Sequence, residues 1–339
     1  MNDVLDNTLD SFLSRWNDPD PRLLVHTSGS TGQPKPLWVE KERMRASARM
    51  TCSFLGLQPG DTALLCLPLQ YIAGIMMVVR SLEWGLTLQT ASPRHPETGS
   101  EPPVFAAMVP LQVARLLQRP SSREWVRGIR HLLIGGGAID ASLEQELRSF
   151  PGAVWSTYGM TETLSHIALR RISASAGDGG PCEVSPWYTP LPGVRLHQNA
   201  EGCLVIDAPR VSAETLVTHD MAELLPDGRF RILGRLDNVI CTGGVKVQIE
   251  QVEALLRPDL GDTFLITSRP DPLYGETVVM LTTRPVDETV FRVLPPYWKP
   301  RHIITVPSLP FTATGKPDRA EAKRIAKSKT FCKGGKCAK

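Results

Sequence analysis

The amino-acid sequence predicts an α/β fold: a large N-terminal α/β domain with a β-rich subdomain, and a small α+β domain at the C-terminus. Three observations support this prediction. Short apolar segments alternate with helical stretches up to about residue 170, which is typical of a sheet with helices on its faces. Pro-Gly and Asp-Gly pairs then indicate strands joined by turns. Beyond Asp237, a shorter mixed pattern of helix and strand signals follows.

The N-terminal part is predicted to alternate strands and helices in a regular order. Residues 1–20 are expected to form a helix, because apolar residues recur at helical spacing before Asp18-Pro19-Asp20-Pro21 interrupts the pattern. The strands predicted after it are Leu23–Val25, Thr62–Leu67, Thr87–Thr90, Val104–Met108 and His131–Ile134. The helices predicted between them are Arg43–Leu55, Gly74–Trp84, Leu111–Leu117 and Ser142–Phe150.

The C-terminal part is predicted to contain a hairpin turn at Asp227-Gly228. Past it, a helix is expected over Ile249–Leu256, with strands over Phe264–Thr267 and Thr277–Thr282. We therefore expect an N-terminal domain over residues 1–236, a small C-terminal domain over 237–326 and a basic, disordered tail over 327–339.

The distribution of charge argues against a nucleic-acid partner. The net charge is +3, but residues 316–339 carry nine Lys or Arg and only two acidic residues. This segment therefore has a charge of +7, and everything before it sums to −4. A basic body that clamps nucleic acid is not expected, because only the tail is basic.

Cysteine usage and hydropathy predict a cytoplasmic protein. Seven cysteines at scattered spacings are typical of reduced thiols, and Cys332 and Cys337 lack the companion ligands of a zinc site. No positively charged, apolar leader opens the sequence, so secretion is not expected. The most apolar run, Thr62–Val79, is interrupted by Pro68 and Gly74, which favours a buried strand and helix over a membrane span.

The most informative segment follows the apolar run Leu23–Val25 and has the sequence His26-Thr27-Ser28-Gly29-Ser30-Thr31-Gly32-Gln33-Pro34-Lys35. Glycine lets successive backbone N–H groups turn toward an anion, while the hydroxyls and the lysine add donors and positive charge. The segment therefore fits a loop that binds the phosphates of a nucleotide. It is not a Walker loop, because no Gly-Lys-Ser/Thr follows at the required spacing. On composition alone, a polar surface turn explains it equally well.

A second segment has the sequence Ser156-Thr157-Tyr158-Gly159-Met160-Thr161-Glu162-Thr163. As local structure it predicts a strand end, a glycine turn and the start of a helix capped by Thr161. As a site, Thr161 can donate to phosphate and Tyr158 can stack on a base or sugar. Glu162 can bind Mg²⁺, because a hard cation on phosphates prefers carboxylate oxygen. Taken alone, the segment favours the structural interpretation.

Three further segments carry weaker signals. Gly135-Gly136-Gly137-Ala138 follows a buried strand and permits flat approach by a planar ring, although a plain loop explains it too. Asp220 can accept ribose hydroxyls and Arg235 can reach sugar or phosphate, although isolated residues of this kind are more typical of surface ion pairs. Thr312-Ala313-Thr314-Gly315-Lys316 presents one lysine on a hydroxyl- and glycine-rich loop.

Along the chain, the five segments are the phosphate loop, the glycine stretch, Tyr-Gly-Met-Thr-Glu, Asp220 with Gly234-Arg235-Leu236-Asp237-Asn238, and Thr-Gly-Lys. This order of motifs, from residue 26 to about residue 319, resembles that of the adenylate-forming superfamily. That superfamily includes acyl-CoA synthetases, luciferases and peptide-synthetase adenylation domains. The resemblance implies that ATP or AMP is bound by Thr27, Ser28, Gly29, Ser30, Thr31, Gly32, Lys35, Gly136, Gly137, Ala138, Thr157, Tyr158, Gly159, Met160, Asp220 and Arg235.

The resemblance also implies a two-step reaction that uses ATP, Mg²⁺ and CoA. A carboxylate attacks the α-phosphate of ATP, pyrophosphate leaves, and the small domain then swings about Asp237 so that a thiol displaces AMP. By position, Lys316 matches the adenylation lysine, Thr161 and Glu162 complete the predicted catalytic set, and Glu162 is the expected Mg²⁺ ligand. Lys316 and Mg²⁺ would stabilise the negative charge that develops on the phosphates. No histidine is expected as a general base, because the nucleophile is already a carboxylate.

The run Leu67-Pro68-Leu69-Gln70-Tyr71-Ile72-Ala73-Gly74, with Arg80 and Val109-Pro110-Leu111-Gln112 after it, resembles the o-succinylbenzoate–CoA ligases of menaquinone synthesis. Their substrate has two carboxylates, of which one reacts and the other needs a cation. Arg80 is the candidate for that second carboxylate, directly or through water. The alternative is that Arg80 caps a helix or extends to solvent. Tyr71, Gly74 and Gly137 are candidate pocket walls.

Two departures from the resemblance stand out. The phosphate loop begins at residue 26, whereas relatives carry a long N-terminal portion before it. The missing surface is either supplied by the partner in a homodimer or dispensed with. Gln70 stands where many relatives have an aromatic residue, which puts the shape of the acyl pocket in doubt.

Two other hypotheses stay open beside the ligase. An adenylation module that loads a carrier-protein thiol would form the acyl-adenylate without needing free CoA. A non-catalytic nucleotide-binding protein would use its basic tail on RNA or an anionic membrane. The joint presence of Lys35, Glu162, Asp220, Arg235 and Lys316 speaks against this last hypothesis.

Overall fold

The computed structural model describes residues 8–27, 35–97, 99, 101–175, 184–312 and 316–328. The chain divides into two compact units. The first comprises Met1–Asn199, Val205–Thr218 and Leu224–Arg231, and the second Ala200–Leu204, His219–Glu223 and Ile232–Lys339. Both units combine helices with β-sheet, so the predicted α/β class is confirmed. The domain boundary at residue 237 stays a prediction.

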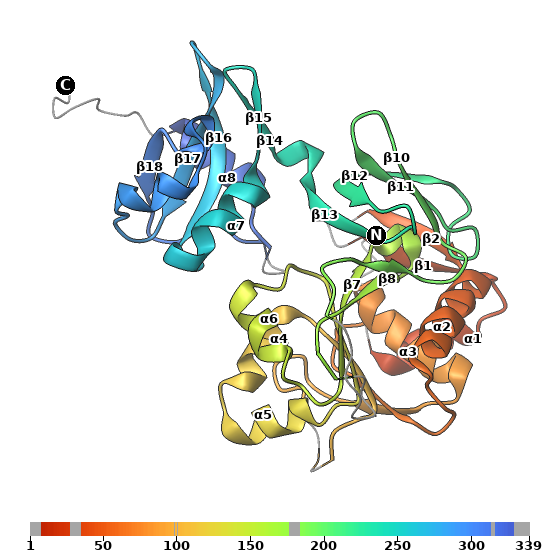
Figure 1. Cartoon of the computed structure of the whole chain (residues 1–339). Helices are drawn as coiled ribbons and strands as arrows, with labels where there is room; N and C mark the ends of the chain where they lie inside the picture. Colours follow the sequence, from red (N-terminus) through yellow and green to blue (C-terminus); the bar gives the residue numbers. More distant parts are fainter. Residues whose placement is uncertain are drawn as a thin grey trace. The chain divides into compact units, whose positions relative to one another are not determined.

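A seven-stranded sheet forms the centre of the first unit (Figure 1), in the order β4-β3-β5-β6-β7-β8-β9. Neighbouring strands from β4 to β7 run parallel, whereas β8 and β9 are antiparallel. All four residues of β6 are buried, as expected for a parallel strand that is covered on both faces. The bounds are β3 Thr62–Leu65, β4 Thr87–Thr90, β5 Phe105–Met108, β6 His131–Ile134, β7 Ala153–Gly159, β8 His166–Arg171 and β9 Thr189–Pro190.

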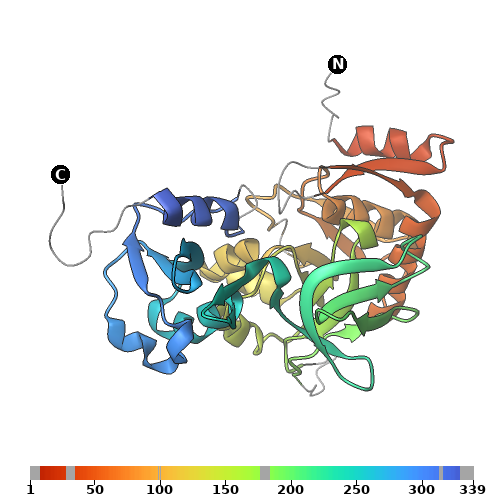
Figure 2. The ribbon, with the colours of Figure 1, turned by 90° about the horizontal axis from the view of Figure 1, so that it is seen from above.

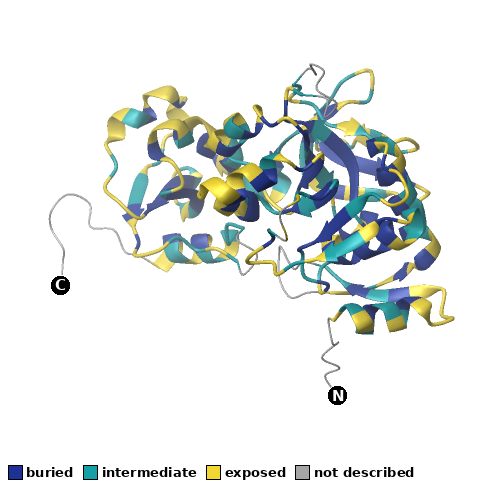
Figure 3. Ribbon diagram, turned by 90° about the horizontal axis from the view of Figure 1, so that it is seen from below, coloured by how far each residue is buried: buried dark blue, intermediate teal, exposed yellow. Residues whose placement is uncertain are grey.

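Helices cover both faces of this sheet (Figure 1). On one face, α4 (Pro110–Leu117), α5 (Pro120–Arg127) and α6 (Ala141–Leu147) pack against the strands through an apolar cluster that includes Leu64, Leu132 and Trp125. On the other face lie α2 (Lys41–Leu55) and α3 (Ile72–Trp84), which also contact each other. Figure 3 shows the resulting pattern, in which buried strands lie beneath helices with exposed outer sides.

A helix and a hairpin form the N-terminal part of the described chain. Helix α1 (Leu9–Asn17) is capped by Thr8, whose hydroxyl accepts a hydrogen bond from the backbone N–H of Ser11 at 3.2 Å. It buries Phe12 and Trp16. Strands β1 (Arg22–His26) and β2 (Pro36–Glu40) pair antiparallel, and Figure 2 shows α1 beside this hairpin.

A four-stranded sheet has the order β10-β11-β12-β13. Its bounds are β10 Arg195–Gln198, β11 Cys203–Asp207, β12 Leu216–Leu224 and β13 Phe230–Arg235. The predicted hairpin between the last two strands is confirmed, because Leu225 donates to the carbonyl of Arg229 at 2.8 Å and Gly228 has a φ of +86°.

In the second unit, β14 (Val239–Thr242), β15 (Val245–Gln248), β16 (Phe264–Asp271), β17 (Gly275–Thr282) and β18 (His302–Thr305) form a five-stranded sheet. Successive residues of β17 face opposite sides, as in any strand. Val278 and Met280 pack into the cluster of α7 (Ile249–Leu260), while Val279 and Leu281 pack with α8 (Arg319–Ser328). The two helices are also joined by a partly buried ion pair between Arg319 and Glu253, with N–O distances of 2.6 and 2.8 Å.

Most predicted elements of the described chain are confirmed, with ends shifted by a few residues. The helix predicted over Ser142–Phe150 ends at Leu147, and the strand predicted over Thr62–Leu67 ends at Leu65. One prediction is wrong: Thr161 does not cap a helix, because the chain makes one 3₁₀ turn over Thr161–Thr163 and returns as β8. The hydroxyl that holds this turn belongs to Thr163. Within the described residues, no helix is long and apolar enough to cross a membrane.

Candidate active site

The site begins where the central parallel strands end. Met108, Ile134 and Ser156 are paired in register across β5, β6 and β7, so the carboxyl ends of these strands meet at one edge of the sheet. The glycine stretch that begins at Gly135 follows β6, and Thr157 continues β7 at the same level. The parallel sheet thus brings two of the predicted nucleotide-binding segments side by side, at the edge where open α/β sheets bind ligands.

These two segments approach so closely that only glycine fits. A Cβ atom on Gly135 would lie 2.2 Å from the Thr157 hydroxyl oxygen, and Gly136 has a φ of +77°. Gly136, Gly137 and Ala138 are exposed beyond this contact. The result is a narrow strip of exposed backbone beside Thr157, which suits a flat ligand.

The Tyr-Gly-Met-Thr-Glu-Thr turn is held rigidly by its own hydrogen bonds. The Thr163 hydroxyl accepts from the backbone N–H of Met160 at 3.0 Å and donates to the carbonyl of Ser165 at 2.7 Å. A Cβ on Gly159 would lie 2.2 Å from that same carbonyl oxygen. Leu164 is buried with a φ of +64°, a left-handed conformation that a branched side chain seldom adopts.

The side chains of this turn point in different directions. Tyr158 packs edge-on against the rings of Tyr188 and Phe230, at centroid distances of 6.1 and 5.2 Å. Thr161 is buried, whereas Glu162 is exposed. Within the described chain the Glu162 carboxylate makes no hydrogen bond or ion pair, so its oxygens are available to a divalent cation. Among the described residues, no group of three His, Cys, Asp or Glu side chains could hold a metal ion by itself.

The predicted phosphate loop is described only at its two ends. Thr27 and Lys35 form two hydrogen bonds: the Thr27 N–H donates to the carbonyl of Lys35, and the Lys35 N–H donates to the Thr27 hydroxyl, both at 3.0 Å. This pairing extends the hairpin of β1 and β2 and closes the loop at its base. Ser28, Gly29, Ser30, Thr31 and Gly32 lie outside the described residues.

Arg80 lies inside the first unit, on α3, with 2% of its surface exposed. The alternative that it caps the helix or extends to solvent is therefore wrong. One guanidinium nitrogen donates to the Ser165 hydroxyl at 2.5 Å, and Nε has no partner. No carboxylate of the described chain forms an ion pair with it. Burial lowers its pKa to about 10, which still leaves it charged at neutral pH.

Three residues around Arg80 were not predicted from the sequence. Ser165 and His166 follow the Tyr-Gly-Met-Thr-Glu-Thr turn, and Thr51 lies on α2. His166 is buried and joins the Ser165 hydroxyl at 3.1 Å through Nδ1 to the Thr51 hydroxyl at 3.0 Å through Nε2. Two adjacent polar residues directly before the apolar run Ile167-Ala168-Leu169 were the signal that could have identified Ser165 and His166.

Tyr71 and Gly74 lie at the N-terminal end of the same helix. A Cβ on Gly74 would lie 2.4 Å from the carbonyl oxygen of Pro68, so glycine lets α3 pack tightly against the preceding loop. Tyr71 is half-buried and its N–H donates to the same carbonyl at 3.2 Å. These contacts give both residues a structural role, and their part in an acyl pocket stays a prediction.

In the second unit, Asp220, Arg235, Asp237 and His219 form one charged cluster. Arg235 bridges the two carboxylates at 2.9 Å each, and His219 Nδ1 lies 2.9 Å from both oxygens of Asp237. Burial raises the pKa of Asp237, but the hydrogen bonds from His219 and Arg235 outweigh it and keep that pKa below its usual value. Arg235 thus joins Asp220, which is predicted to bind the ribose, to Asp237, which is the predicted hinge residue.

Lys316 lies in the same unit, and two charges of this cluster affect its pKa. Burial lowers its pKa, the charge of Arg235 lowers it further, and Asp220 opposes the change. Its backbone pairs with Thr312, with hydrogen bonds of 2.8 and 3.2 Å that close the lysine loop. Ala313, Thr314 and Gly315 lie outside the described residues.

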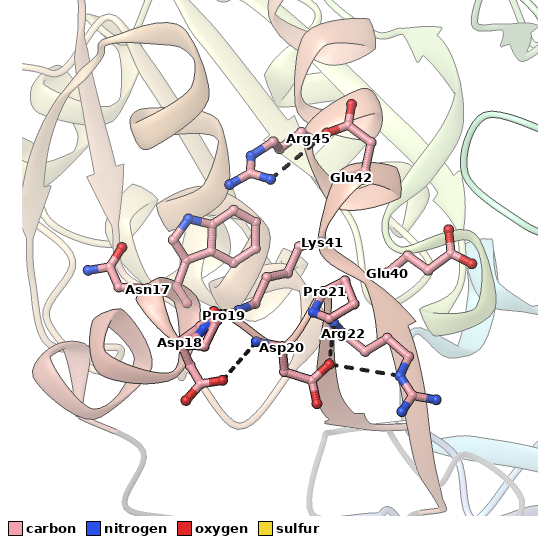
Figure 4. Close-up of a pocket in the computed structure, with 11 residues that line it drawn as sticks. Asn17, Asp18, Pro19, Asp20, Pro21, Arg22, Glu40, Lys41, Glu42 and Arg45 are labelled. Atoms are coloured by element: carbon pink, nitrogen blue, oxygen red, sulfur yellow. Dashed lines mark hydrogen bonds and ion pairs between the residues drawn. The ribbon is translucent and has the colours of Figure 1, made fainter.

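A pocket of about 620 Å³ lies between the end of α1, the start of α2 and the residues Arg22 and Glu40 of the β1–β2 hairpin (Figure 4). None of the predicted site residues lines it. Its charges are compensated locally: Lys41 Nζ donates to the carbonyl of Asp18 at 2.7 Å, and Arg45 lies over the Trp16 ring and 3.9 Å from Glu42. These contacts tie α1 to the start of α2, and they explain the pocket as a packing feature.

Comparison with known proteins places this geometry in a family. The chain is 24% identical over 341 residues to a 2-succinylbenzoate–CoA ligase of Bacillus cytotoxicus, covering 90% of this chain and 70% of that protein. It is 31% identical to an acyl-CoA synthetase (AMP-forming)/AMP-acid ligase II-like protein of Dyadobacter fermentans, with a TM-score of 0.61 over 93% of this chain and 92% of that one.

The fold is shared more widely. The o-succinylbenzoate coenzyme A synthetase (MenE) of Bacillus subtilis, solved with ATP and magnesium, superposes with a TM-score of 0.70 at 23% identity, covering 88% of this chain and 69% of that one. The predicted resemblance to adenylate-forming enzymes, and to o-succinylbenzoate–CoA ligases among them, is confirmed. The model of the family described as AMP-binding enzyme matches residues 6–207, well over half of the sequence, and the chain therefore belongs to that family.

Proposed function

We propose that this protein adenylates o-succinylbenzoate with ATP and transfers the acyl group to CoA. The observation that carries the choice of acid is the buried Arg80 guanidinium, which has no carboxylate partner in the described chain. A buried charge is costly unless a counter-ion or hydrogen bonds compensate it. A substrate with a second carboxylate supplies that counter-ion, directly or through Ser165 and a water molecule. The name shared by the curated relatives, 2-succinylbenzoate–CoA ligase, supports the same acid.

The nucleotide is assigned to the edge of the sheet. The adenine would lie against the exposed backbone of Gly136–Ala138, and Tyr158 would border the sugar. Thr27, Lys35 and the loop between them would bind the phosphates together with Thr161. In the second unit, Asp220 would accept the ribose hydroxyls and Arg235 would hold that carboxylate in place, as its 2.9 Å contact with it supports.

The chemistry of the first step is electrostatic. The carboxylate of the acid attacks the α-phosphate and pyrophosphate leaves, so negative charge develops on both phosphate groups. Lys316 would stabilise that charge electrostatically, although burial and the charge of Arg235 lower the pKa of its ammonium. Mg²⁺ would neutralise phosphate charge when bound, and the exposed Glu162 would hold it.

The second step needs CoA and a swing of the small domain about its hinge. We place the hinge at Asp237, in the 3₁₀ turn Leu236–Asn238 that follows β13. Its hydrogen bonds to His219 and Arg235 would restrain one state of the hinge and would have to break for the other. A cytoplasmic location accompanies this proposal, because ATP and CoA are cytoplasmic substrates.

Pyrophosphate release tests the proposal. The purified protein is given ATP and Mg²⁺ with o-succinylbenzoate, with 4-oxo-4-phenylbutanoate, which lacks the ring carboxylate, with a medium-chain fatty acid or with amino acids, each with and without CoA. We expect release with o-succinylbenzoate, and AMP with thioester only when CoA is present. Release without any response to CoA would identify a carrier-protein adenylation module instead. No release from the panel would contradict the proposal.

A further inference from the structure

A continuous hydrogen-bond chain connects Arg80 to the backbone of α2. It runs from Arg80 through Ser165, His166 and Thr51 to the carbonyl of Ser47, with successive distances of 2.5, 3.1, 3.0 and 3.2 Å. Arg80, His166, Thr51 and Ser47 are buried, and Ser165 is the partly exposed member. These hydrogen bonds therefore link α3, the turn before β8, the first residue of β8 and α2.

The hydrogens along this chain can be placed by counting donors. The Thr51 hydroxyl donates to the Ser47 carbonyl, so its oxygen accepts from His166, which must carry its proton on Nε2. Nδ1 is then an acceptor, and the Ser165 hydroxyl must donate to it. The Ser165 oxygen is left to accept from Arg80. Each hydroxyl donates once and accepts once, and one tautomer of a neutral imidazole satisfies the whole chain.

We propose that Thr51 and His166 are positioning residues that orient Ser165 and, through it, hold the Arg80 guanidinium ready for the second carboxylate of the substrate. This inference rests on the proposed function, because it assigns Arg80 to that carboxylate. The reason is geometric: Arg80 has no carboxylate in the described chain to fix its orientation, and Ser165 is its one oxygen partner there. Without the His166 imidazole as its acceptor, the Ser165 hydroxyl can rotate. The Arg80 guanidinium, which donates to the substrate carboxylate, is then no longer held in one orientation.

The environment keeps this imidazole neutral. Burial lowers the pKa of His166 well below its usual value, and the nearby charge of Arg80 lowers it further. The neighbouring Cys52 thiol also stays neutral, because burial raises its pKa to about 11 despite the attraction of Arg80. Arg80 therefore remains the single charge of this group, and no anion of the group competes with a substrate carboxylate.

Thr51→Val is the decisive variant, since valine has the shape of threonine without the hydroxyl. We expect KM for o-succinylbenzoate in pyrophosphate release to rise about tenfold, because Ser165 and its hydrogen bond to the charged Arg80 are no longer fixed in position. The kcat, and the KM for 4-oxo-4-phenylbutanoate, should stay within about twofold, because that acid does not use Arg80. Thr51→Ser keeps the hydroxyl and should restore the wild-type KM.

Ser81→Ala is the matched control. Ser81 is buried next to Arg80 on α3, but its hydroxyl bonds only to the Met77 carbonyl of the same helix at 3.0 Å. It should leave the KM for both acids unchanged. An equal rise in KM for both acids in Thr51→Val would overturn the inference, and so would an unchanged KM for the dicarboxylate.

A second measurement does not depend on catalysis. With ¹⁵N-labelled histidine, NMR should show His166 neutral with its proton on Nε2 at pH 7, and Thr51→Val should shift that resonance. A protonated ring or a proton on Nδ1 would overturn the inference whatever the substrate. If the NMR result holds but the wild-type protein releases pyrophosphate with neither acid, the proposed function fails and the assignment of Thr51 and His166 to a carboxylate fails with it. A normal dicarboxylate preference with the wrong tautomer overturns the positioning role alone.

Discussion

Two arginines of this protein show opposite ways of holding a positive charge. Arg235 is partly exposed and bridges Asp220 and Asp237 at 2.9 Å each, so its charge is already balanced by carboxylates of the chain. Arg80 is 2% exposed and is bound by a serine hydroxyl and a methionine sulfur, with no carboxylate of the described chain. Under the proposed function, Arg235 organises residues of the protein, whereas Arg80 is kept for an anion that arrives with the substrate.

The largest effect is expected outside both arginines, at Lys316. Lys316→Ala should lower the rate of adenylation about a hundredfold or more, as when one positioned transition-state donor is lost. Thioester formation from supplied acyl-adenylate should be nearly unchanged. The two half-reactions are measured separately by pyrophosphate release and by thioester yield, and an equal loss in both would contradict the assignment.

Arg80→Met should show the second largest effect. Methionine keeps much of the volume and removes the charge, so KM for o-succinylbenzoate should rise about 10- to 100-fold, the range for a lost hydrogen bond between charged groups. KM for 4-oxo-4-phenylbutanoate should change little. Thermal unfolding should show unchanged or higher stability, because an uncompensated buried charge is removed. A parallel rise in KM for both acids would make Arg80 structural.

Asp237→Pro tests the Arg235 side of the comparison, because it removes one of the two carboxylates that Arg235 bridges. Proline restricts φ and removes the carboxylate that restrains the turn, so adenylation should be retained while thioester formation slows about tenfold or more. Arg235→Lys, which cannot bridge both carboxylates in the same way, should weaken ATP binding instead. Normal overall turnover in Asp237→Pro would remove the hinge assignment.

The last prediction concerns stability at mildly acidic pH and not catalysis. Burial lowers the pKa of His131 to about 4 and that of His166 well below its usual value, so both are neutral in the folded protein. Below the unfolded pKa of about 6.5, the unfolded chain binds protons that the folded chain does not. Stability should therefore be fully present above pH 6.5 and be lost as the pH falls, with His131 contributing a slope of about 1 kcal/mol per pH unit between pH 6 and its folded pKa of about 4. His131→Phe should make the decline of the unfolding midpoint with pH shallower, and an unchanged slope would contradict this account.

The sequence predicted best what depends on short-range pattern. Strands β3, β5 and β6 carry apolar runs bounded by turn residues, and they and β4 lie within two residues of where they were predicted. Helix α5 was not predicted because it begins with Pro120, Ser121 and Ser122, which are residues typical of turns. Proline nevertheless suits the first turn of a helix. The helix expected after Gly159 is one 3₁₀ turn, because Thr163 and the left-handed Leu164 reverse the chain there.

The candidate site was predictable only where its residues are neighbours in the sequence. The glycine stretch and the Tyr-Gly-Met-Thr-Glu-Thr turn were identified, and their strands place them side by side. The Thr51–His166 contact joins positions 115 residues apart, so no local pattern could indicate it. Sequence could name Arg80 as a candidate, but only the structure shows that its buried charge has no carboxylate partner in the described chain.

The most direct test of this account is the ratio of kcat/KM for o-succinylbenzoate over 4-oxo-4-phenylbutanoate, measured by pyrophosphate release in the wild-type protein and in Arg80→Met. We predict a clear preference for the dicarboxylate in the wild type and its loss, by about 10- to 100-fold, in the variant. A wild-type protein that treats the two acids alike, or a variant that keeps the preference, would contradict the claim that Arg80 is reserved for a substrate carboxylate.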